Sequence, residues 1–442
     1  MQGWSLNVTS FYNGLGPIIV MPILVFILAL LFSVKPGKAF RSSLTVGVSL
    51  IGIFAIIGLL ISMLDPFVGS GTGRHDVIDL GWSPLTFVTW ASPFAPIVIG
   101  MTVLINLVMI KFNLTKTFNV DVWNYWHFAF AGILVYHGTN SVVLGLLAAS
   151  FASIVLLKLA DWTAPMVHKH FNVPGVSITT LSSVIFFPVG WLGNKIIDWI
   201  PGLRNWDLTP QSIQKRLGFF GEPYIVGLLM GLLLGIVTGS DVKGILTVGL
   251  TCSALMFLMP RVVKFLMEGL TPITEAVREK YKKRYPDRKD IYIGLDVSVA
   301  AGNPTVITTA LILLPLFIIV AFIMPGNRVF PLGDLANLTT LIAMVVLASK
   351  GNMFRSLLIG IPILIADLYI AAQMAPVLTN MLRNTQVDVH VPSDDLLLTS
   401  ALDGGNPFRY WIYYLFQGDL IALSLIPVIG LLLFWLVKDL RR

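Results

Sequence analysis

Long apolar runs occupy most of this chain. Of its 442 residues, 56% are hydrophobic and only 12% are charged, whereas soluble domains carry roughly 25% charged residues. Many of the runs are close to the ~20 residues that a helix needs to cross the hydrocarbon core of a bilayer. The sequence therefore predicts an all-α polytopic membrane protein.

The apolar runs predict about eleven transmembrane helices, which lie in two halves with one helix after them. Their approximate bounds are 17–34, 43–64, 86–110, 123–137, 141–160, 223–240, 244–267, 305–324, 335–349, 355–376 and 411–437. Two other apolar segments, 173–200 and 391–410, are broken by Pro, Gly and Ser or Thr. We interpret both as re-entrant hairpins, because non-helical backbone persists at membrane depth only where protein or a water-filled cavity surrounds it.

Short patterns recur in the same order in the two halves. The pairs are Gly16-Pro17 with Gly221-Glu222-Pro223, Thr45-Val46-Gly47 with Thr247-Val248-Gly249, Trp90-Ala91-Ser92-Pro93 with Gly302-Asn303-Pro304, Asp121 with Asp334, and Asn172-Val173-Pro174 with His390-Val391-Pro392. Any one match could arise by chance in an apolar chain, but their shared order favours a duplication. Duplicated membrane halves are typical of secondary-type transporters, whose substrate binds where the repeats meet.

Charged loops give the two halves opposite orientations. The loop after residue 267 carries the basic residues that mark a cytoplasmic loop, namely Arg278, Lys280, Lys282, Lys283, Arg284, Arg288 and Lys289. The matching first-half loop has Arg74 against Asp65, Asp76 and Asp79, so we expect it outside. With the N-terminus outside and the C-terminus cytoplasmic, the halves form an inverted repeat. The net charge of +7 then reflects topology, and we predict no nucleic-acid partner.

These signals divide the chain into four parts. Residues 1–200 form the first repeat with its hairpin, and 201–220 form a cytoplasmic linker. Residues 221–410 form the second repeat, which includes the cytoplasmic loop 268–292 and the hairpin 391–410. Residues 411–442 form a final helix and a cytoplasmic tail.

Motifs of soluble-type catalysis are missing from the sequence. It has no GxSxG, no P-loop, no HExxH and no CxxC, which argues against an ATP-driven pump or a membrane hydrolase. We therefore predict no catalytic residue, no cofactor and no metal site. The single cysteine, Cys252, lies inside an apolar run and is interpreted as a buried small hydrophobic residue.

Polar groups within apolar sequence are the candidate substrate-binding residues, because they are costly in a bilayer. His127 and Asn124 lie in Trp123-Asn124-Tyr125-Trp126-His127. Aromatic rings beside an imidazole and an amide suit a polyhydroxylated ligand, although a histidine paired between helices explains the pattern equally well.

Acidic residues at predicted helix breaks are further candidates. Glu222 begins a helix between Gly221 and Pro223, where a simple cap is an alternative. Asp296 precedes the broken stretch Gly302-Asn303-Pro304. Asp403 and Asn406 lie in Asp403-Gly404-Gly405-Asn406-Pro407, where the glycines allow close approach or merely form a turn.

Two weaker candidates offer hydroxyls only. Ser92 interrupts a helix in Trp90-Ala91-Ser92-Pro93, and Thr180 lies in Thr179-Thr180-Leu181-Ser182-Ser183 of the first hairpin. We interpret Asp121 and Asp334 as helix caps and leave them out of the site. Because none of the candidates is Arg or Lys, the set suits a neutral polyol better than a phosphate or a carboxylate.

Longer motifs point to a family. They are Asn119-Val120-Asp121-Val122-Trp123-Asn124 with Trp126-His127, Gly218-Phe219-Phe220-Gly221-Glu222-Pro223, Asp241-Val242-Lys243-Gly244, Leu258-Met259-Pro260-Arg261-Val262, Gly269-Leu270-Thr271-Pro272-Ile273, Ile293-Gly294-Leu295-Asp296, Pro325-Gly326-Asn327 and Asp403-Gly404-Gly405. On these motifs the chain resembles, almost end to end, the membrane subunit (enzyme IIC) of galactitol-type phosphotransferase systems.

The resemblance implies a bacterial inner-membrane permease that takes up a sugar or polyol. A separate cytoplasmic IIB protein phosphorylates the substrate from a phosphocysteine, and a IIA protein recharges IIB. The related ascorbate-type fold implies a homodimer with a scaffold and a mobile core that works as an elevator. Cys252 lies in a transmembrane run, so this chain contains no fused IIB with its reactive cysteine.

One departure leaves the substrate open. Galactitol-type members carry Pro-His-Gly-Thr where this chain has Thr179-Thr180-Leu181-Ser182, so a different polyol or sugar is an alternative. An ion-coupled secondary transporter, with Asp296 and Glu222 as proton or sodium sites, fits the repeats and the intramembrane carboxylates as well. A transporter-like sugar sensor is a third alternative.

Overall fold

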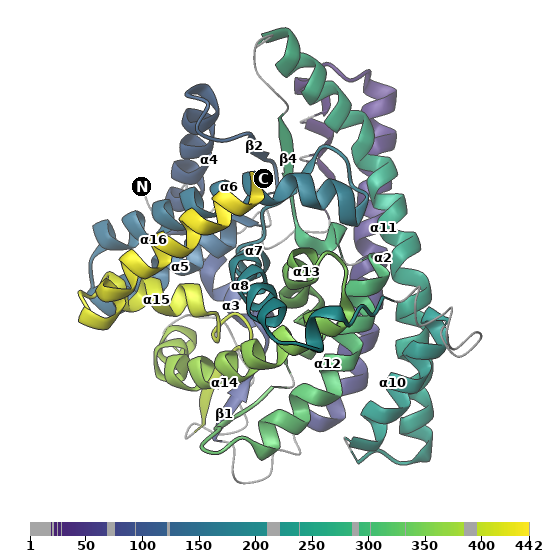
Figure 1. Cartoon of the computed structure of the whole chain (residues 1–442). Coiled ribbons are helices and arrows are strands. Elements are labelled where there is room, and N and C mark those ends of the chain that lie inside the picture. The colour runs from purple at the N-terminus through teal and green to yellow at the C-terminus, as the bar shows by residue number, and fades with distance from the viewer. Residues whose placement is uncertain are drawn as a thin grey trace.

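The computed structural model describes residues 19, 22–23, 25–27, 29–68, 76–92, 94–121, 124–209, 222–237, 239–284, 291–300, 302–331, 333–383 and 396–441. Several predicted features therefore lie outside the described residues: the N-terminal segment, most of the linker 201–220, the end of the loop 268–292 and the start of the hairpin 391–410. The described chain is mainly helical, with two small sheets (Figure 1).

The first half contains α2 (Pro36–Val68), β1 (Val77–Asp79), α3 (Trp82–Ala91), α4 (Ala95–Lys111), β2 (Thr117–Asn119), α5 (Tyr125–Thr139), α6 (Val142–Phe171), β3 (Val176–Ile178), α7 (Leu181–Val184), α8 (Phe186–Trp199) and the 3₁₀ helix η2 (Leu203–Asn205). The second half contains α10 (Pro223–Val237), α11 (Val242–Arg284), β4 (Tyr292–Leu295), η4 (Val297–Val299), α12 (Pro304–Ile323), β5 (Val329–Phe330), η5 (Leu335–Asn337), α13 (Leu338–Ala348), α14 (Met353–Arg383) and β6 (Leu397–Thr399), followed by α15 (Pro407–Leu415) and α16 (Leu420–Leu440).

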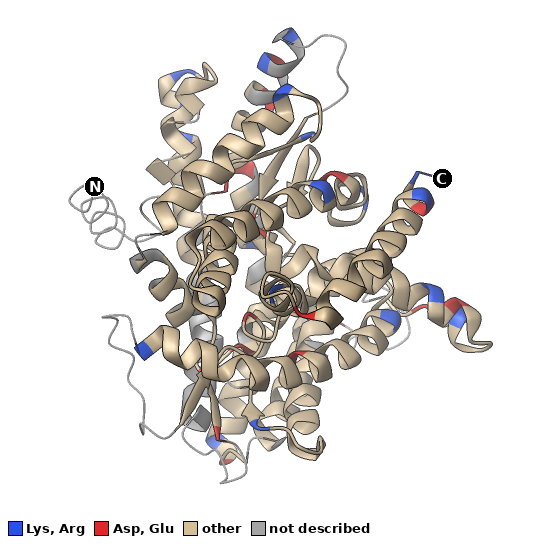
Figure 2. Ribbon diagram, turned by 90° about the vertical axis from the view of Figure 1, so that its left-hand side faces the viewer, with Lys and Arg blue, Asp and Glu red and all other residues tan. Residues whose placement is uncertain are grey.

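Four helices of the described chain are long and apolar enough to cross a membrane, namely α6, α12, α14 and α16. Shorter apolar helices or helical stretches occur in α4, α10, α11 and α13. Figure 2 shows Lys and Arg mainly near helix ends, with long uncharged stretches between them. This distribution agrees with a helical membrane protein, and the number of eleven spans stays a prediction.

Two of the predicted helices are divided in the structure, and the predicted helix 244–267 continues well beyond its predicted end. The predicted span 86–110 is divided into α3 and α4 around Ser92, next to the sequence position Pro93, whose missing N–H cannot continue a helix. The predicted final helix 411–437 is likewise two helices, α15 and α16. Gly418 has a φ of 79° and Asp419 caps α16 by accepting from Ala422 N at 2.8 Å. Such a pair ends one helix and starts another.

The third difference concerns α11, which continues as a helix to Arg284 through most of the predicted loop 268–292. Glu, Lys, Arg and Ala dominate the end of this segment, and they are strong helix formers. The charged residues of this loop as far as Arg284 therefore lie on helical backbone rather than in a coil.

The two sheets are the main departure from the all-α prediction. The strand orders are β5-β1-β6 and β2-β4-β3, and all pairs are parallel. In the first sheet a strand of the first half lies between two strands of the second half. In the second sheet β4, from the second half, lies between two strands of the first half. Strands of two to four residues are too short to show the alternating pattern by which strands are predicted.

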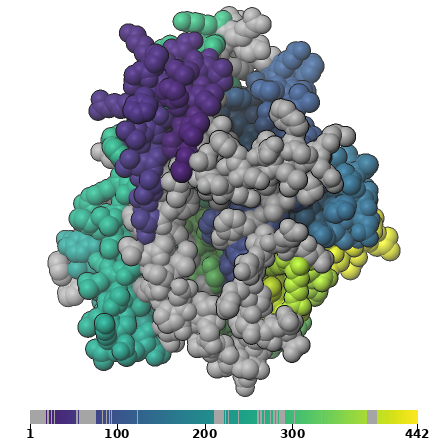
Figure 3. Space-filling model, turned by 180° about the vertical axis from the view of Figure 1, so that it is seen from behind, coloured from purple at the N-terminus to yellow at the C-terminus, as the bar shows by residue number. Residues whose placement is uncertain are grey.

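The sheets lie at opposite ends of a central region. In Figure 1, β2 and β4 are near the top, β1 is near the bottom, and α7 and α13 lie between them. Helix α11 packs on both α2 and α10, and the three lie at one side of the molecule (Figure 1). Seen from behind, purple and teal residues lie toward the left and blue and yellow residues toward the right (Figure 3).

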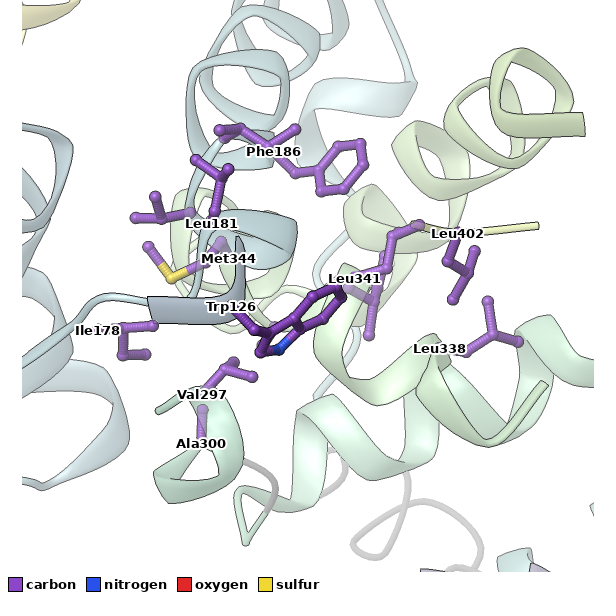
Figure 4. Packing of buried hydrophobic residues seen from close by; sticks show 14 of the residues in the cluster. Trp126, Ile178, Leu181, Phe186, Val297, Ala300, Leu338, Leu341, Met344 and Leu402 are labelled. Atoms are coloured by element: carbon purple, nitrogen blue, oxygen red, sulfur yellow. The ribbon is translucent and has the colours of Figure 1, made fainter. Parts of the chain in front are cut away.

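Residues of both halves pack around Trp126, whose side chain is 1% exposed. Figure 4 shows its indole among Ile178 and Leu181 of the first half and residues of the second half such as Leu341. Cys252 is also 1% exposed and packs against Gly231 of α10, which confirms its interpretation as a buried small residue.

Candidate functional site

The turns that follow β3 and β6 meet inside the protein. Ser182 and Asp403 each lie four positions after the last residue of their strand, Ile178 and Thr399. Both side chains are buried, and the Ser182 hydroxyl donates a hydrogen bond to Asp403 Oδ1. The two halves therefore contribute matching positions to one contact.

Arg409, in the first turn of α15, holds this contact together. Its Nη1 donates to Asp403 Oδ1 at 2.7 Å and to the Asp403 carbonyl at 3.1 Å. Its Nη2 donates to Ser182 Oγ at 2.9 Å and to His127 Nδ1 at 2.6 Å. The guanidinium is 1% exposed, so its charge depends on the Asp403 carboxylate for compensation. We call Ser182, Asp403, Arg409 and His127 the central cluster.

The contact with Arg409 determines the tautomer of His127. A guanidinium only donates hydrogen bonds, so Nδ1 must be the acceptor. A neutral His127 then carries its proton on Nε2, which is the donor that it can offer to a ligand. Aromatic rings enclose this part of the cluster: the guanidinium carbon is 5.5 Å from the ring centre of Trp126 and 5.0 Å from that of Phe130.

Asn406 and two glycines position the second turn. Asn406 caps α15, because its Oδ1 accepts from Arg409 N at 3.2 Å, and this cap fixes the helical turn that carries Arg409. A side chain at Gly405 would collide with the carbonyl oxygens of Ala401 and Asp367. The glycine therefore allows the turn to lie directly on α14, which is a role in packing rather than contact with a ligand.

Two buried acids hold the backbone of the same turn. Asp79 accepts hydrogen bonds from the backbone N–H groups of Gly81, Asp334 and Ala401 at 2.9–3.0 Å. Asp334 accepts from the hydroxyl of Ser400 and from Leu402 N. Asp79, which the sequence analysis counted among the charges of an outside loop, is buried, with an exposed fraction of 2%. Asp334 makes no hydrogen bond as a helix cap; its carboxylate binds the turn instead.

The turn after β3 is held by uncharged side chains and one acid. Thr180 donates to Asp296 Oδ2 at 2.7 Å and accepts from Val297 N at 2.8 Å. Asn124 Nδ2 donates to Thr179 Oγ1 at 2.8 Å. The structure thus brings Thr180, Asp296 and Asn124 to the turn that carries Ser182, beside the central cluster.

Several buried polar atoms around these turns have no hydrogen-bond partner within the described part of the chain. They are Asn124 Oδ1, Trp126 Nε1, Ser183 Oγ, both carboxyl oxygens of Asp367, Asn406 Nδ2 and Arg409 Nε. Buried polar groups are normally paired. Unpaired donors and acceptors therefore lie on both sides of the contact between the turns. A hydroxyl-bearing ligand could form hydrogen bonds to them, because a hydroxyl both donates and accepts.

Two predicted site residues lie elsewhere. Glu222 directly precedes α10, where its side chain interacts with the nearby Tyr224. Helix α10 packs on α11 and α12. Ser92 ends α3, and its hydroxyl accepts from Phe94 N at 3.3 Å. Both residues act at helix ends, and the structure does not bring them into the central cluster.

Sequence reasoning missed Arg409: the candidate residues included no Arg or Lys, whereas the central cluster contains this arginine. The sequence signal for Arg409 was an arginine in an apolar segment, three positions after Asn406, which makes it a candidate for a functional site. Asp367 carried the same signal, as the one acidic residue within α14.

Comparison with known proteins gives a consistent result. Residues 10–394 match the family described as the PTS system sugar-specific permease component. The chain is 33% identical over 437 residues to the PTS system galactitol-specific EIIC component of Escherichia coli strain K12, which covers 97% of this chain and 96% of that protein. The galactitol-specific EIIC component of Escherichia coli O157:H7 shows the same identity and coverage.

Proposed function

Because this chain belongs to the family of PTS sugar-specific permease components, we propose that it carries galactitol or a related polyol, and that the polyol binds where the turns after β3 and β6 meet. Membership of the family makes the chain a multi-pass membrane protein and the sugar or polyol permease component of a phosphotransferase system. It also implies IIA and IIB partner proteins in general. The substrate and its binding residues are the proposal.

The arrangement of the central cluster is the observation that carries the proposal. A hydroxyl group both donates and accepts hydrogen bonds, so it requires protein groups of both kinds. The site offers His127 Nε2, Arg409 Nε and Asn406 Nδ2 as donors, and Asp403 and Asn124 Oδ1 as acceptors. Arg409 is already paired with Asp403, so the described residues of the central cluster present no unpaired cation for a phosphate or carboxylate substrate.

The transfer step requires the partner proteins. The S–P bond of the IIB phosphocysteine breaks and a P–O bond forms to a substrate hydroxyl, whose proton passes to the released thiolate or to solvent. The residues of this chain bind and orient that hydroxyl. Cys252 is buried within α11, so it is no substitute for the phosphocysteine.

The arrangement of the halves is part of the proposal. We propose two inverted repeats with re-entrant hairpins, about eleven spans, an outside N-terminus and a cytoplasmic C-terminus; the strand orders β5-β1-β6 and β2-β4-β3 support the repeat. One order becomes the other when β1, β5 and β6 are exchanged for β4, β2 and β3. The packed group α2, α10 and α11 is our proposed scaffold, and the elements that carry the central cluster form the mobile core of a homodimer.

The ion-coupled alternative is not favoured, because the matching family consists of phosphotransferase components. The two mechanisms differ in product: group translocation yields a phosphorylated polyol, whereas ion coupling yields the free polyol.

Uptake of radiolabelled galactitol into membrane vesicles tests the proposal. The vesicles contain this chain, and the assay is run with and without the cognate IIA and IIB proteins and phosphoenolpyruvate. We expect galactitol phosphate only when the partners are present. Free galactitol that accumulates under an ion gradient would contradict the mechanism. A phosphorylated product from another hexitol, with none from galactitol, would keep the mechanism and replace the substrate.

A further inference from the structure

Asp367 is a fully buried acid with no hydrogen-bond partner among the described residues. It lies in α14, its side chain is 0% exposed, and both of its carboxyl oxygens are unpaired. The other buried acids nearby, Asp79 and Asp334, each accept several hydrogen bonds. An unpaired buried carboxyl group is among the most costly features that a folded chain can carry.

The position of Asp367 connects it with the central cluster. Its backbone carbonyl lies against Gly405, so this part of α14 packs directly under the turn that carries Asp403. Its carboxyl group interacts electrostatically with Asp334 and Asp403. Asp367 therefore belongs to the same buried polar region, although it takes no part in the hydrogen bonds that hold the turn.

Two unpaired donors accompany this unpaired acceptor. Asn406 Nδ2 and Arg409 Nε are buried and have no partner in the described part of the chain, and Asn406 directly follows the glycine that contacts Asp367. A ligand for these groups must both donate and accept. Hydroxyls do both, an ammonium group only donates, and a phosphate dianion only accepts and is repelled by the acids. The described residues contain no grouping that could hold a metal ion.

We propose that Asp367 is a specificity-determining residue, which binds hydroxyl groups of the substrate together with Asn406 and Arg409. The inference rests on the proposed function, since it requires a polyol substrate. Two carboxylate oxygens can accept from hydroxyls on neighbouring carbons, so Asp367 selects a substrate that has both of them. A site that hydrogen-bonds a hydroxyl discriminates strongly against an analogue that lacks it.

The test measures galactitol binding to the purified full-length protein in nanodiscs by equilibrium dialysis, together with the melting temperature of the ligand-free protein. Asp367→Leu should weaken binding about tenfold to a hundredfold. It should also raise the melting temperature, because it removes an unpaired buried carboxyl group. Asp367→Asn keeps one acceptor oxygen and should give an intermediate affinity. Among the monodeoxy galactitols, one should bind the wild type more weakly than galactitol does. The same analogue should bind Asp367→Leu with the same affinity as galactitol.

Asp161→Asn is the matched control. Asp161 is an acid in the interior of α6, and it accepts from Thr115 Oγ1, Lys116 N and Thr117 Oγ1 at 2.9–3.0 Å. Its replacement should lower the melting temperature and leave galactitol affinity within about twofold, since its partners are structural.

The outcomes separate this inference from the proposed function. If the wild type binds galactitol and both Asp367 variants bind it equally well, the role of Asp367 is refuted and the function stands. If both variants lose binding and melt at lower temperature than the wild type, Asp367 is a structural residue and the inference is again refuted. If the wild type binds neither galactitol nor any other hexitol, the proposed function fails and the inference fails with it.

Discussion

The turn after β3 and the turn after β6 hold matching places in the fold, yet they carry different chemistry. The first presents hydroxyls, with Thr180, Ser182 and Ser183 in one short segment. The second presents Asp403 and Asn406 and leads directly to Arg409. A common strand-and-turn frame brings the two segments into contact, and the difference in side chains makes the contact asymmetric. One half supplies the charged groups and the other supplies neutral partners for them.

The acidic residues that hold the two turns also differ in burial and in the number of backbone groups that they bind. Asp79 is 2% exposed and binds three backbone N–H groups behind the second turn. Asp296 is only partly buried and binds Thr180 and one backbone N–H group behind the first turn. Because the second turn depends on more buried charge, mutations in it should lower the stability of the protein more than mutations in the first turn.

Replacement of Arg409 should give the largest effect. Arg409→Met leaves the Asp403 carboxylate buried without its cation, and the loss of stability should be about 3–5 kcal/mol. Thermal unfolding of the detergent-solubilised protein measures it. The double variant Arg409→Met with Asp403→Leu removes both charges and should recover part of the loss. A single variant that melts like the wild type would show that the pair is not buried in the folded protein.

Gly405→Ala should cost about 2–4 kcal/mol, because the added Cβ meets backbone oxygens of the turn and of α14 rather than a movable side chain. Gly100→Ala is the control, since nothing lies within 4 Å of a Cβ at that helical position. The control should be neutral or stabilising by up to about 1 kcal/mol. Equal melting temperatures for the two variants would mean that the second turn does not lie on α14 as described.

Neighbouring serines sharpen the comparison within the first turn. Ser182→Ala removes a donor to Asp403 and an acceptor for Arg409, so we expect a loss of about 1–2 kcal/mol. Ser183→Ala removes a buried hydroxyl that has no partner among the described residues, so ligand-free stability should not fall. Thermal unfolding of both variants measures the difference. A Ser182→Ala variant that is more stable than Ser183→Ala would contradict the role of Ser182.

The smallest effect should come from Arg328→Ala at the exposed end of the first sheet. Arg328 forms an ion pair with Asp76, but the side chains are 46% and 54% exposed. Such pairs contribute less than about 1 kcal/mol, and the contribution falls as salt rises. Melting temperatures at low and high salt test this expectation. A loss as large as that of Arg409→Met would remove the distinction between exposed and buried pairs.

The membrane class and part of the central cluster could be predicted from sequence. A polar group in an apolar segment is costly wherever it lies, so His127, Asp403 and Asn406 stood out before any contact was known. Glu222 gave the same signal and lies at the start of α10, away from the central cluster. The cost of placing a polar group in a bilayer identifies unusual residues, but it does not show which of them lie in contact.

Contacts between distant segments could not be predicted. His127 and Arg409 are 282 positions apart, and Ser182 and Asp403 are 221 apart, so no local spacing brings them together. The strands that align the two turns have two to four residues, too few for a periodic pattern. Arg409 was overlooked because basic residues elsewhere in the chain are explained by topology.

Formation of galactitol phosphate in vesicles tests the central claim most directly, with the wild type and Asp403→Asn compared at equal amounts of membrane protein. Our account predicts that the wild type forms the product only with IIA, IIB and phosphoenolpyruvate, and that Asp403→Asn loses most of it. Equal product from Asp403→Asn, or accumulation of free galactitol without the partners, would contradict the account.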